Sequence, residues 1–424
     1  MILTLLQYAE SLTQLLPDSE VMRMSDPDVT FPSDPATIDE TAALDRFLEL
    51  TKIPATSGEE LPVAQAIQRL LAEAGVAESQ MRLDDANSRT RLSGNCGNLV
   101  VHLPGSGKGA TTLLSAHMDT VPICKHCEPA VEGDVVRSAA DTGLGADDRS
   151  GVAAVVTALI ERIRLGDAQF PPAVAAFLIQ EEIGLEGARC LDTSVVGPVD
   201  RAFNFDGGAS HEIRHGAIGG ERIDVCVRGM PAHAGVAPET GVSAIVISSL
   251  AIAELAQKGW LGKVVHESGE GTANVGIIQG GDATNVITPE VTLRAEARSH
   301  DAAMRTRIVR EMKSAFESAA SQVKNTDGDC GSIEFASHVD YDSFLLPDDH
   351  PSIEFAAEAI RTVGRTPVTE VANGGLDANW LYRHGIEAVT LGSGQRNIHT
   401  ADEVLDIPRY LDACRMATWL ITRE

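Results

Sequence analysis

The chain has 424 residues, of which 43% are hydrophobic and 22% charged, values typical of a globular protein with more than one core. Its formal net charge of −27 argues against nucleic acid and anionic membranes as partners, because both need clustered basic residues. The N-terminus has neither a basic stretch nor a long apolar run, and the seven scattered cysteines suggest no disulfide framework, so we expect a cytoplasmic protein.

Residues 1–40 begin with a short helical pattern and continue into a stretch rich in Pro and Asp, which we interpret as an N-terminal extension. Two helical segments follow between residues 42 and 75, separated by Pro54. Short apolar strands then alternate with helices, an order typical of an α/β sheet with parallel members. The predicted strands are 98–103, 112–116, 174–180, 202–205 and 388–391, and the predicted helices are 151–160 and 352–363.

The middle of the chain has a different order of elements. It follows the strand-helix-strand-strand-helix-strand pattern of a ferredoxin-like layer. Its predicted strands are 223–227, 273–279, 291–297 and 332–338, and its predicted helices are 242–256 and 303–323. We therefore predict an α/β fold in which a catalytic domain of residues 41–218 and 341–424 has a mixed, mostly parallel sheet with helices on both faces. An α+β lid or dimerisation domain is expected to be inserted at 219–340.

Ligand-type side chains stand after the predicted strands or before a helix at five points along the chain. Each one alone has an ordinary explanation, since an Asp before a helix is usually an N-cap and an Asp before Gly-Gly a turn residue. In open α/β sheets, however, sites form at the carboxyl ends of strands, so these side chains should converge. Imidazoles and carboxylates together suit a pair of divalent ions such as zinc, cobalt or manganese. The residues are His117 and Asp119, Asp147, Glu181 and Glu182, Asp206, and His399.

Three segments carry a family resemblance: 115–122 reads SAHMDTVP, 145–151 reads GADDRSG and 181–184 reads EEIG. They resemble the motifs of the M20 metallopeptidases, and within that group the chain is most similar to peptidase T-like tripeptidases. The likeness extends from about residue 44 to the C-terminus. It implies an enzyme that holds two divalent ions, with zinc favoured over cobalt or manganese, and that hydrolyses the N-terminal peptide bond of short peptides.

The resemblance also implies a role for each candidate residue. Asp147, joined to Asp148 by a cis peptide bond, would bridge the two ions, and Asp119 would fix the tautomer of His117 through a hydrogen bond. Glu181 has no ligand role and is the candidate general base and acid, because an attacking water still needs a group that takes its proton. The remaining metal ligands would be His117 and Asp206 on the first ion, and Glu182 and His399 on the second.

The same resemblance implies substrate contacts. His233 would stabilise the oxyanion, often from the partner subunit, so we expect a homodimer formed through the inserted domain. Asn285 would approach the substrate, although it could equally cap its own turn. Arg298 would bind a substrate carboxylate, with Arg294 on the same strand face as the alternative contact. The glycines that would permit close approach of the substrate backbone are Gly375 and Gly394.

The metal ligands alone leave the substrate open. An N-acyl-amino-acid deacylase or a carboxypeptidase would use the same core. A silent scaffold on the same fold is disfavoured because every expected position is filled, and an unrelated dinuclear aminopeptidase fold is disfavoured by the inserted stretch 220–338. The ligand set does not determine the native metal or the preferred peptide side chains.

Overall fold

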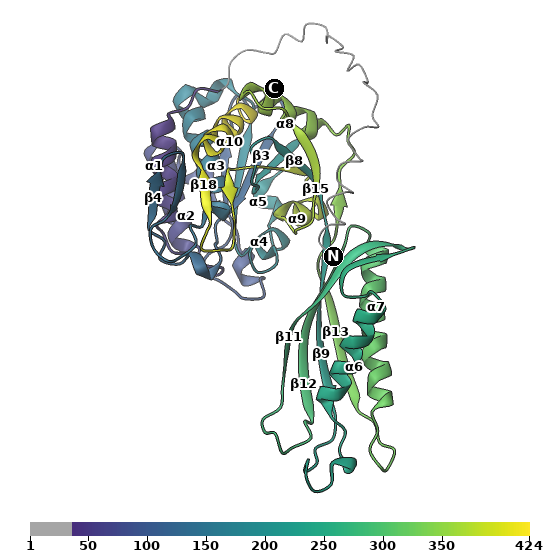
Figure 1. The fold of residues 1–424 in the computed structure, drawn as a ribbon. Coiled ribbons are helices and arrows are strands. Elements are labelled where there is room, and N and C mark those ends of the chain that lie inside the picture. The colour runs from purple at the N-terminus through teal and green to yellow at the C-terminus, as the bar shows by residue number, and fades with distance from the viewer. Residues whose placement is uncertain (1–35) are drawn as a thin grey trace, which may run out of the picture. The chain divides into compact units, whose positions relative to one another are not determined.

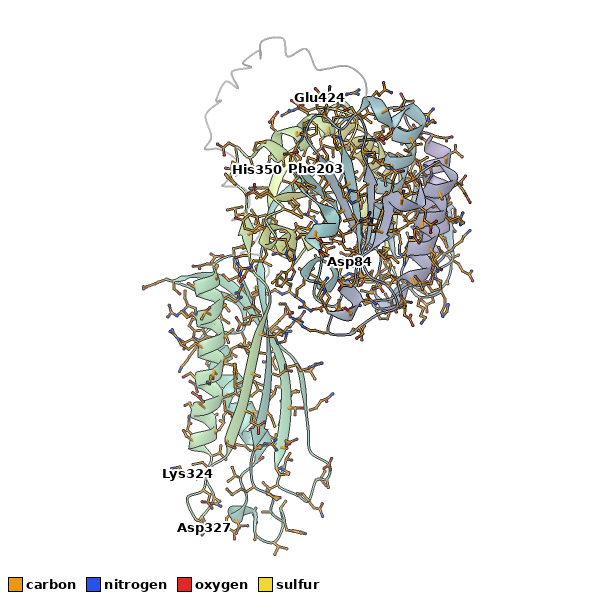
Figure 2. All side chains as sticks on the ribbon, turned by 180° about the vertical axis from the view of Figure 1, so that it is seen from behind. Asp84, Phe203, Lys324, Asp327, His350 and Glu424 are labelled. Carbon is orange, nitrogen blue, oxygen red and sulfur yellow. The ribbon has the colours of Figure 1, made fainter. Side chains whose placement is uncertain are left out.

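The computed structural model describes residues 36–424, so the predicted N-terminal helix and the Pro- and Asp-rich stretch lie outside the described residues. Two hydrophobic clusters form within this range, one around a large sheet and one around a smaller sheet. Figure 2 shows the side chains of both parts, with Asp84 and Phe203 in the first and Lys324 and Asp327 in the second. Within the described range, no helix has the length and apolar character needed to cross a membrane.

The larger sheet is mixed, with nine strands (Figure 1). Its strands are β1 (Met81–Leu83), β2 (Leu99–Leu103), β3 (Thr112–His117), β6 (Ala173–Leu178), β7 (Arg201–Phe205), β8 (Glu212–Ala217), β14 (Phe344–Leu345), β15 (Val368–Ala372) and β16 (Ala388–Leu391). They run in the order β1-β2-β6-β3-β7-β16-β8-β14, and β15 also pairs with β8. The central strands β6, β3, β7 and β16 are parallel, whereas β1, β2 and β14 pair antiparallel with their neighbours, so the parallel part is smaller than predicted.

Helices pack against this sheet and against one another. They are α1 (Glu40–Thr51), α2 (Leu61–Glu73), α3 (Ala146–Leu165), α4 (Glu186–Arg189), α5 (Thr193–Val196), α8 (Pro351–Thr362), α9 (Asp377–Arg383) and α10 (Ile407–Leu420). Helix α3 lies against α1, α2 and α10 and against strands β3 and β7, while α4 contacts α9. Asp39 and Asp406 cap the helices α1 and α10, because each side chain accepts a hydrogen bond from a first-turn N–H.

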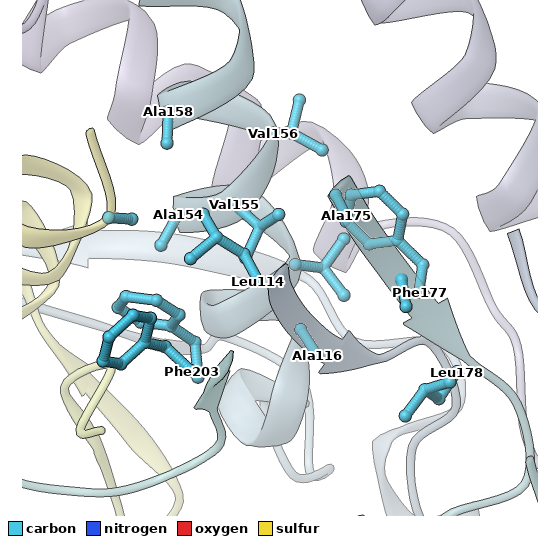
Figure 3. Packing of buried hydrophobic residues seen from close by; sticks show 14 of the residues in the cluster. Leu114, Ala116, Ala154, Val155, Val156, Ala158, Ala175, Phe177, Leu178 and Phe203 are labelled. Atoms are coloured by element: carbon cyan, nitrogen blue, oxygen red, sulfur yellow. The ribbon is translucent and has the colours of Figure 1, made fainter. Parts of the chain in front are cut away.

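Small residues let α3 lie close to the sheet. Ala154 and Ala158 face the same packed region as Val155, which lies near Leu114 of β3 and Phe203 of β7 (Figure 3), and all five are fully buried. Burial of one such valine or leucine contributes about 1.5–3 kcal/mol relative to an exposed position. This packing fixes the strand ends and the start of α3 relative to one another.

The smaller sheet has five antiparallel strands in the order β10-β11-β12-β9-β13, with α6 and α7 side by side against it (Figure 1). Its elements are β9 (Gly219–Arg228), α6 (Ala244–Gln257), β10 (Gly262–His266), β11 (Gly269–Gly280), β12 (Glu290–Ser299), α7 (Ala302–Gln322) and β13 (Ser332–Tyr341). The predicted order is present, with β10 as an additional strand. Only Val264 of β10 is buried, so this edge strand has no apolar pattern to reveal it.

A third sheet of four short strands, in the order β17-β18-β5-β4, was not predicted. Its strands are β4 (Pro129–Glu132), β5 (Val135–Ser138), β17 (Gln395–Arg396) and β18 (Val404–Asp406). The predicted fold class is confirmed: a mixed α/β sheet with helices is combined with a smaller α+β layer. The central parallel strands bring their carboxyl ends to one edge of the large sheet.

Candidate metal centre

The predicted ligand residues converge at this edge. β3 ends at His117, which pairs with Leu178 at the end of the parallel strand β6, so Glu181 and Glu182 begin only three residues beyond. Asp206 directly follows β7. Asp147 enters from the first turn of α3, where its backbone angles are not helical, and the expected cis peptide bond between Asp147 and Asp148 is present.

Asp147 lies between two imidazoles. Its Oδ1 is 3.1 Å from His117 Nε2, and its Oδ2 is 3.2 Å from His399 Nε2. On the first side, Asp206 Oδ1 lies 3.9 Å from His117 Nε2. On the second side, Glu182 Oε2 lies 2.9 Å from His399 Nε2. The five side chains therefore form two sets that share Asp147.

These separations fit metal ligation. Two ligands bound to one tetrahedral zinc at about 2.1 Å lie about 3.4 Å from each other. The measured separations between donor atoms run from 2.9 to 3.9 Å. Donor atoms of His117, Asp147 and Glu182 lie within 4.8 Å of one another, and so do those of His117, Asp148 and Asp206, so Asp148 also has an oxygen close to the first set. Glu182 Oε1 is buried and has no hydrogen-bond partner among residues 36–424. A buried carboxylate oxygen in that state is costly, and a cation relieves the cost.

The pKa values of the site reflect an excess of negative charge. Burial raises the pKa of Asp206 well above its ordinary value, and the charge of Asp147 raises it further. Burial lowers the pKa of His117, but the carboxylates of Asp119 and Asp147 outweigh this effect, so the pKa is raised overall. Hydrogen bonds to Asp147 and Glu182 raise the pKa of His399 to about 10. Two divalent cations would balance this charge.

Asp119 contacts more of the site than the sequence suggested. Its backbone carbonyl oxygen lies 3.1 Å and its Oδ1 3.4 Å from His117 Nδ1, which leaves Nε2 of the imidazole to face Asp147. The carboxylate also accepts hydrogen bonds from the N–H groups of Glu181 (3.0 Å) and Glu182 (3.2 Å), and from Ser57 Oγ (2.6 Å). Asp119 therefore ties the loop that carries both glutamates to the first histidine.

Glu181 lies beside the first set of ligands. Its Oε2 is 4.0 Å from His117 Nε2, and its side chain is 12% exposed. Burial raises the pKa of Glu181 well above its ordinary value. A carboxyl group with a raised pKa, placed at the wall of a cavity, is suited to accept and return a proton.

Two residues that hold the site were missed. Glu403 is buried and accepts hydrogen bonds from the N–H groups of Gly145 (2.6 Å) and Asp147 (3.0 Å), so it fixes the loop that presents Asp147. Gln395 is also buried and donates from Nε2 toward Asp147 and Asp206. Neither residue belongs to a motif, and a lone Glu in a loop or a lone Gln in a two-residue strand gave no sequence signal.

A cavity of about 660 Å³ opens next to the candidate metal ligands. Of the predicted substrate residues, Arg298 and Gly375 line it. A Cβ at Gly375 would lie 2.4 Å from the ring of Tyr341, so glycine is needed there. Arg294 lies in a separate cavity and is paired with Asp224. Of these two arginines, Arg298 is the one that lines the cavity beside the candidate metal ligands.

Three other predicted residues are not brought into this cavity. The N–H of Gly394 donates to Gly208 O and its carbonyl accepts from the N–H of Asp406, so its backbone groups are already engaged. The loops of His233 and Asn285 pair with each other: His233 forms an isolated bridge with Val286, and Ala234 N–H donates to Asn285 O. A contact of either residue with the metal centre of the same chain is not present in the described residues.

Glu60 holds the loop that carries Glu181 and Glu182 through a hydrogen bond with the residue before it. Its buried Oε1 accepts hydrogen bonds from the N–H groups of Gly58 (2.8 Å) and Gln180 (3.0 Å). Burial, with a smaller contribution from the charge of Asp119, raises the pKa of Glu60 to about 7. Glu60 therefore makes its full contribution to the free energy of unfolding below about pH 4.3, the pKa of a Glu in the unfolded chain. This contribution is lost as the pH rises through about 7.

Glu60→Gln should remove this pH dependence. The free energy of unfolding of the variant, relative to the wild type, is expected to rise by up to about 3 kcal/mol between about pH 5 and pH 8. Urea unfolding at both pH values measures the difference, and any pH-independent effect of the substitution cancels. Glu73→Gln, on a side chain that is 62% exposed, is the control and should show no such rise. An equal effect of Glu60→Gln at both pH values would contradict the assignment.

Comparison with known proteins identifies the family. Residues 214–324 match the M20 peptidase dimerisation domain, and residues 98–216 match peptidase family M28. An uncharacterised Bacillus subtilis protein, YqjE, is 33% identical over 389 residues, covering 91% of this chain and 98% of the relative. Two crystal structures each cover 91% of this chain and 98% of their own. A Staphylococcus aureus tripeptidase has a TM-score of 0.81 at 29% identity, and aminopeptidase PepT from Bacillus cereus has 0.77 at 30% identity. The chain therefore belongs to the M20 family of metallopeptidases, resembles its peptidase T-like tripeptidases, and is a hydrolase of peptide bonds.

Proposed function

We propose that this enzyme is a dinuclear metal-dependent aminopeptidase that removes the N-terminal residue of short peptides, chiefly tripeptides. The observation that carries the proposal is the position of Asp147, whose two oxygens face the imidazoles of His117 and His399 at 3.1 and 3.2 Å. Two bound divalent ions, with zinc favoured over cobalt or manganese, would polarise the scissile carbonyl and lower the pKa of the attacking water. His117 and Asp206 would hold the first ion, Glu182 and His399 the second, and Asp147 both.

Protein side chains would supply the proton transfers and the orientation. Glu181 would take the proton of the attacking water and return it to the departing amine, acting first as base and then as acid. Asp119 would keep Glu181 in place through the hydrogen bond from its backbone N–H. Gly375 would permit close approach of the peptide at the cavity wall.

The inserted domain, which we place at residues 219–340, is proposed to be the lid and the dimer contact. The match of residues 214–324 to a dimerisation domain supports a homodimer. His233 and Asn285 would then act on the cavity of the partner subunit, since neither lines the cavity of its own chain. A cytoplasmic location and the domain boundaries, including an extension of residues 1–40, stay predictions.

A panel of substrates tests the proposed specificity. Metal-loaded enzyme is expected to release the N-terminal residue from free tripeptides, with slower cleavage of dipeptides and no cleavage of N-acylated amino acids. Mass spectrometry of the products shows which end is removed. Release of the C-terminal residue would instead identify a carboxypeptidase, and turnover of acyl-amino acids alone would identify a deacylase.

Arg298 is expected to bind the C-terminal carboxylate of the peptide. The guanidinium of Arg298 donates two hydrogen bonds to the carboxylate of Glu296, from Nε to Oε1 (3.1 Å) and from Nη2 to Oε2 (3.0 Å). Its Nη1 has no hydrogen-bond partner within residues 36–424. Loss of a hydrogen bond to a charged group costs about 1.5–3 kcal/mol, so Arg298→Ala should raise the KM of free tripeptides by about 10–100-fold. Tripeptide amides should change little, and Arg294→Ala is the matched control. Equal losses for acids and amides would contradict this role.

A further inference from the structure

We propose that Gln395 is a positioning residue that orients the two carboxylates of the first metal site, Asp147 and Asp206, before a cation binds. The inference rests on the proposed dinuclear site and concerns a residue outside its ligand set. Gln395 begins the short strand β17, is 4% exposed, and lines the cavity beside the ligands.

The contacts of Gln395 select the first site. Its Nε2 lies 3.4 Å from Asp147 Oδ1 and 3.3 Å from Asp206 Oδ1. These same two oxygens are the ones nearest His117 Nε2, at 3.1 and 3.9 Å. A carboxylate oxygen has two lone-pair positions, so each can accept an amide hydrogen and still bind a cation.

The groups on its two sides determine which way the carboxamide of Gln395 points. Gln395 Oε1 lies 3.4 Å from Ser150 Oγ and 3.5 Å from Ser393 Oγ, and the two hydroxyl oxygens are 2.7 Å apart. Both serines are fully buried. The hydroxyls also have backbone acceptors, at 2.7 Å from Ser150 Oγ to Ala146 O and 3.2 Å from Ser393 Oγ to Gly207 O, so this side accepts either end of the amide. Ionised carboxylates on the other side can only accept. The amide nitrogen therefore faces Asp147 and Asp206.

The carboxamide of Gln395 reduces the repulsion between the carboxylates of Asp147 and Asp206. Two carboxylates aimed at one point repel each other when both are ionised and no cation is bound, and the repulsion is strong in a buried site. The two N–H groups of one carboxamide hold both at a fixed separation, so less reorganisation is needed when the ion arrives. In the second site, Glu182 Oε2 and Asp147 Oδ2 face the imidazole of the candidate ligand His399, at 2.9 and 3.2 Å from its Nε2. Within residues 36–424 no residue outside the ligand set donates to Glu182, whose Oε1 is buried without a partner. Only the first site therefore has a donor outside its ligand set that contacts both of its carboxylates.

Cobalt(II) binding to the metal-stripped full chain tests the proposal. All variants in the first comparison also carry Glu182→Gln, because this substitution leaves the first site, made by His117, Asp147 and Asp206, intact. In this background, Gln395→Leu is expected to weaken cobalt binding by about 10–100-fold, the usual effect of losing a residue that orients a ligand, and to change the visible absorption of the bound cobalt. In the complementary Asp206→Asn background, the same substitution should weaken the second site clearly less than the first, because there Gln395 contacts only the shared ligand Asp147 and neither Glu182 nor His399.

The outcomes separate the inference from the proposed function. Unchanged cobalt affinity and spectrum in Gln395→Leu would overturn the role of Gln395, and so would equal weakening of both sites, which indicates general loss of structure. Gln395→Met, of similar length and without a donor, gives the same comparison if the leucine variant does not fold. Gln80→Leu is the matched control, since its carboxamide bonds only backbone groups, at Ala77 and His102. A wild-type chain that binds no cobalt would instead contradict the dinuclear site itself.

Discussion

Glu181→Gln is expected to abolish most peptide hydrolysis while both metal sites stay filled. The side chain keeps its size, and the backbone N–H of residue 181 still donates to Asp119 Oδ1, at 3.0 Å in the wild type. What is lost is a group that can accept a proton, because a carboxamide has no basic oxygen of comparable strength. A positioned general base contributes about 10²–10⁴-fold in rate, so kcat should fall by that factor while KM changes little.

The adjacent Glu182 provides the sharpest comparison. Glu182→Gln removes a proposed ligand, so it should lose the second ion first and regain activity when metal is added in excess. Glu181→Gln should not respond to added metal, because its sites are already full. Metal content per chain and kcat on one tripeptide, measured across a metal titration, distinguish the two. A Glu181→Gln enzyme that holds two ions and keeps more than about a tenth of the wild-type kcat would exclude Glu181 as the base.

The convergence of the candidate metal ligands could be predicted because each lies next to an element that is visible in the sequence. The apolar runs that become β3, β6 and β7 are continuous and fully buried, or nearly so, so their ends could be located. His117, Glu182 and Asp206 stand at or just beyond those ends. Parallel pairing of the three strands then brings the residues together, and this topology follows from the alternation of strands and helices.

Contacts that hold the site from residues distant in the sequence could not be predicted in the same way. Glu403 contacts the N–H of Asp147, and Gln395 contacts the side chain of Asp147, across about 250 residues of sequence. Both arise from short loops and the two-residue strand β17, where no periodic pattern exists. Gly394 was expected to permit close approach of the substrate backbone, but its own N–H donates to Gly208 O and its carbonyl accepts from the N–H of Asp406. A glycine in a loop is as often required by the turn itself as by a ligand.

Asp147→Ala is expected to empty both metal sites. Asp147 is the one carboxylate among the described residues whose two oxygens face the two site imidazoles, at 3.1 Å from His117 Nε2 and 3.2 Å from His399 Nε2. In the proposed site, its removal would leave the first ion with His117 and Asp206, and the second with Glu182 and His399. Two protein ligands are fewer than the three or four that zinc sites normally have.

The loss should appear in stability as well as in metal content. A ligand present at about 100 times its Kd stabilises a fold by about 2.7 kcal/mol, so two filled sites add about 5 kcal/mol that Asp147→Ala cannot gain. Calorimetry with and without metal measures this increment within each variant, so the effect of the substitution on the metal-free fold cancels. Asp206→Asn and Glu182→Gln should each lose about half of this metal-dependent stabilisation. Asp348→Ala, on a side chain that is 98% exposed, is the control and should lose none. Retention of one fully bound ion by Asp147→Ala would mean that Asp147 serves a single site, because a bridging carboxylate cannot be removed without weakening both.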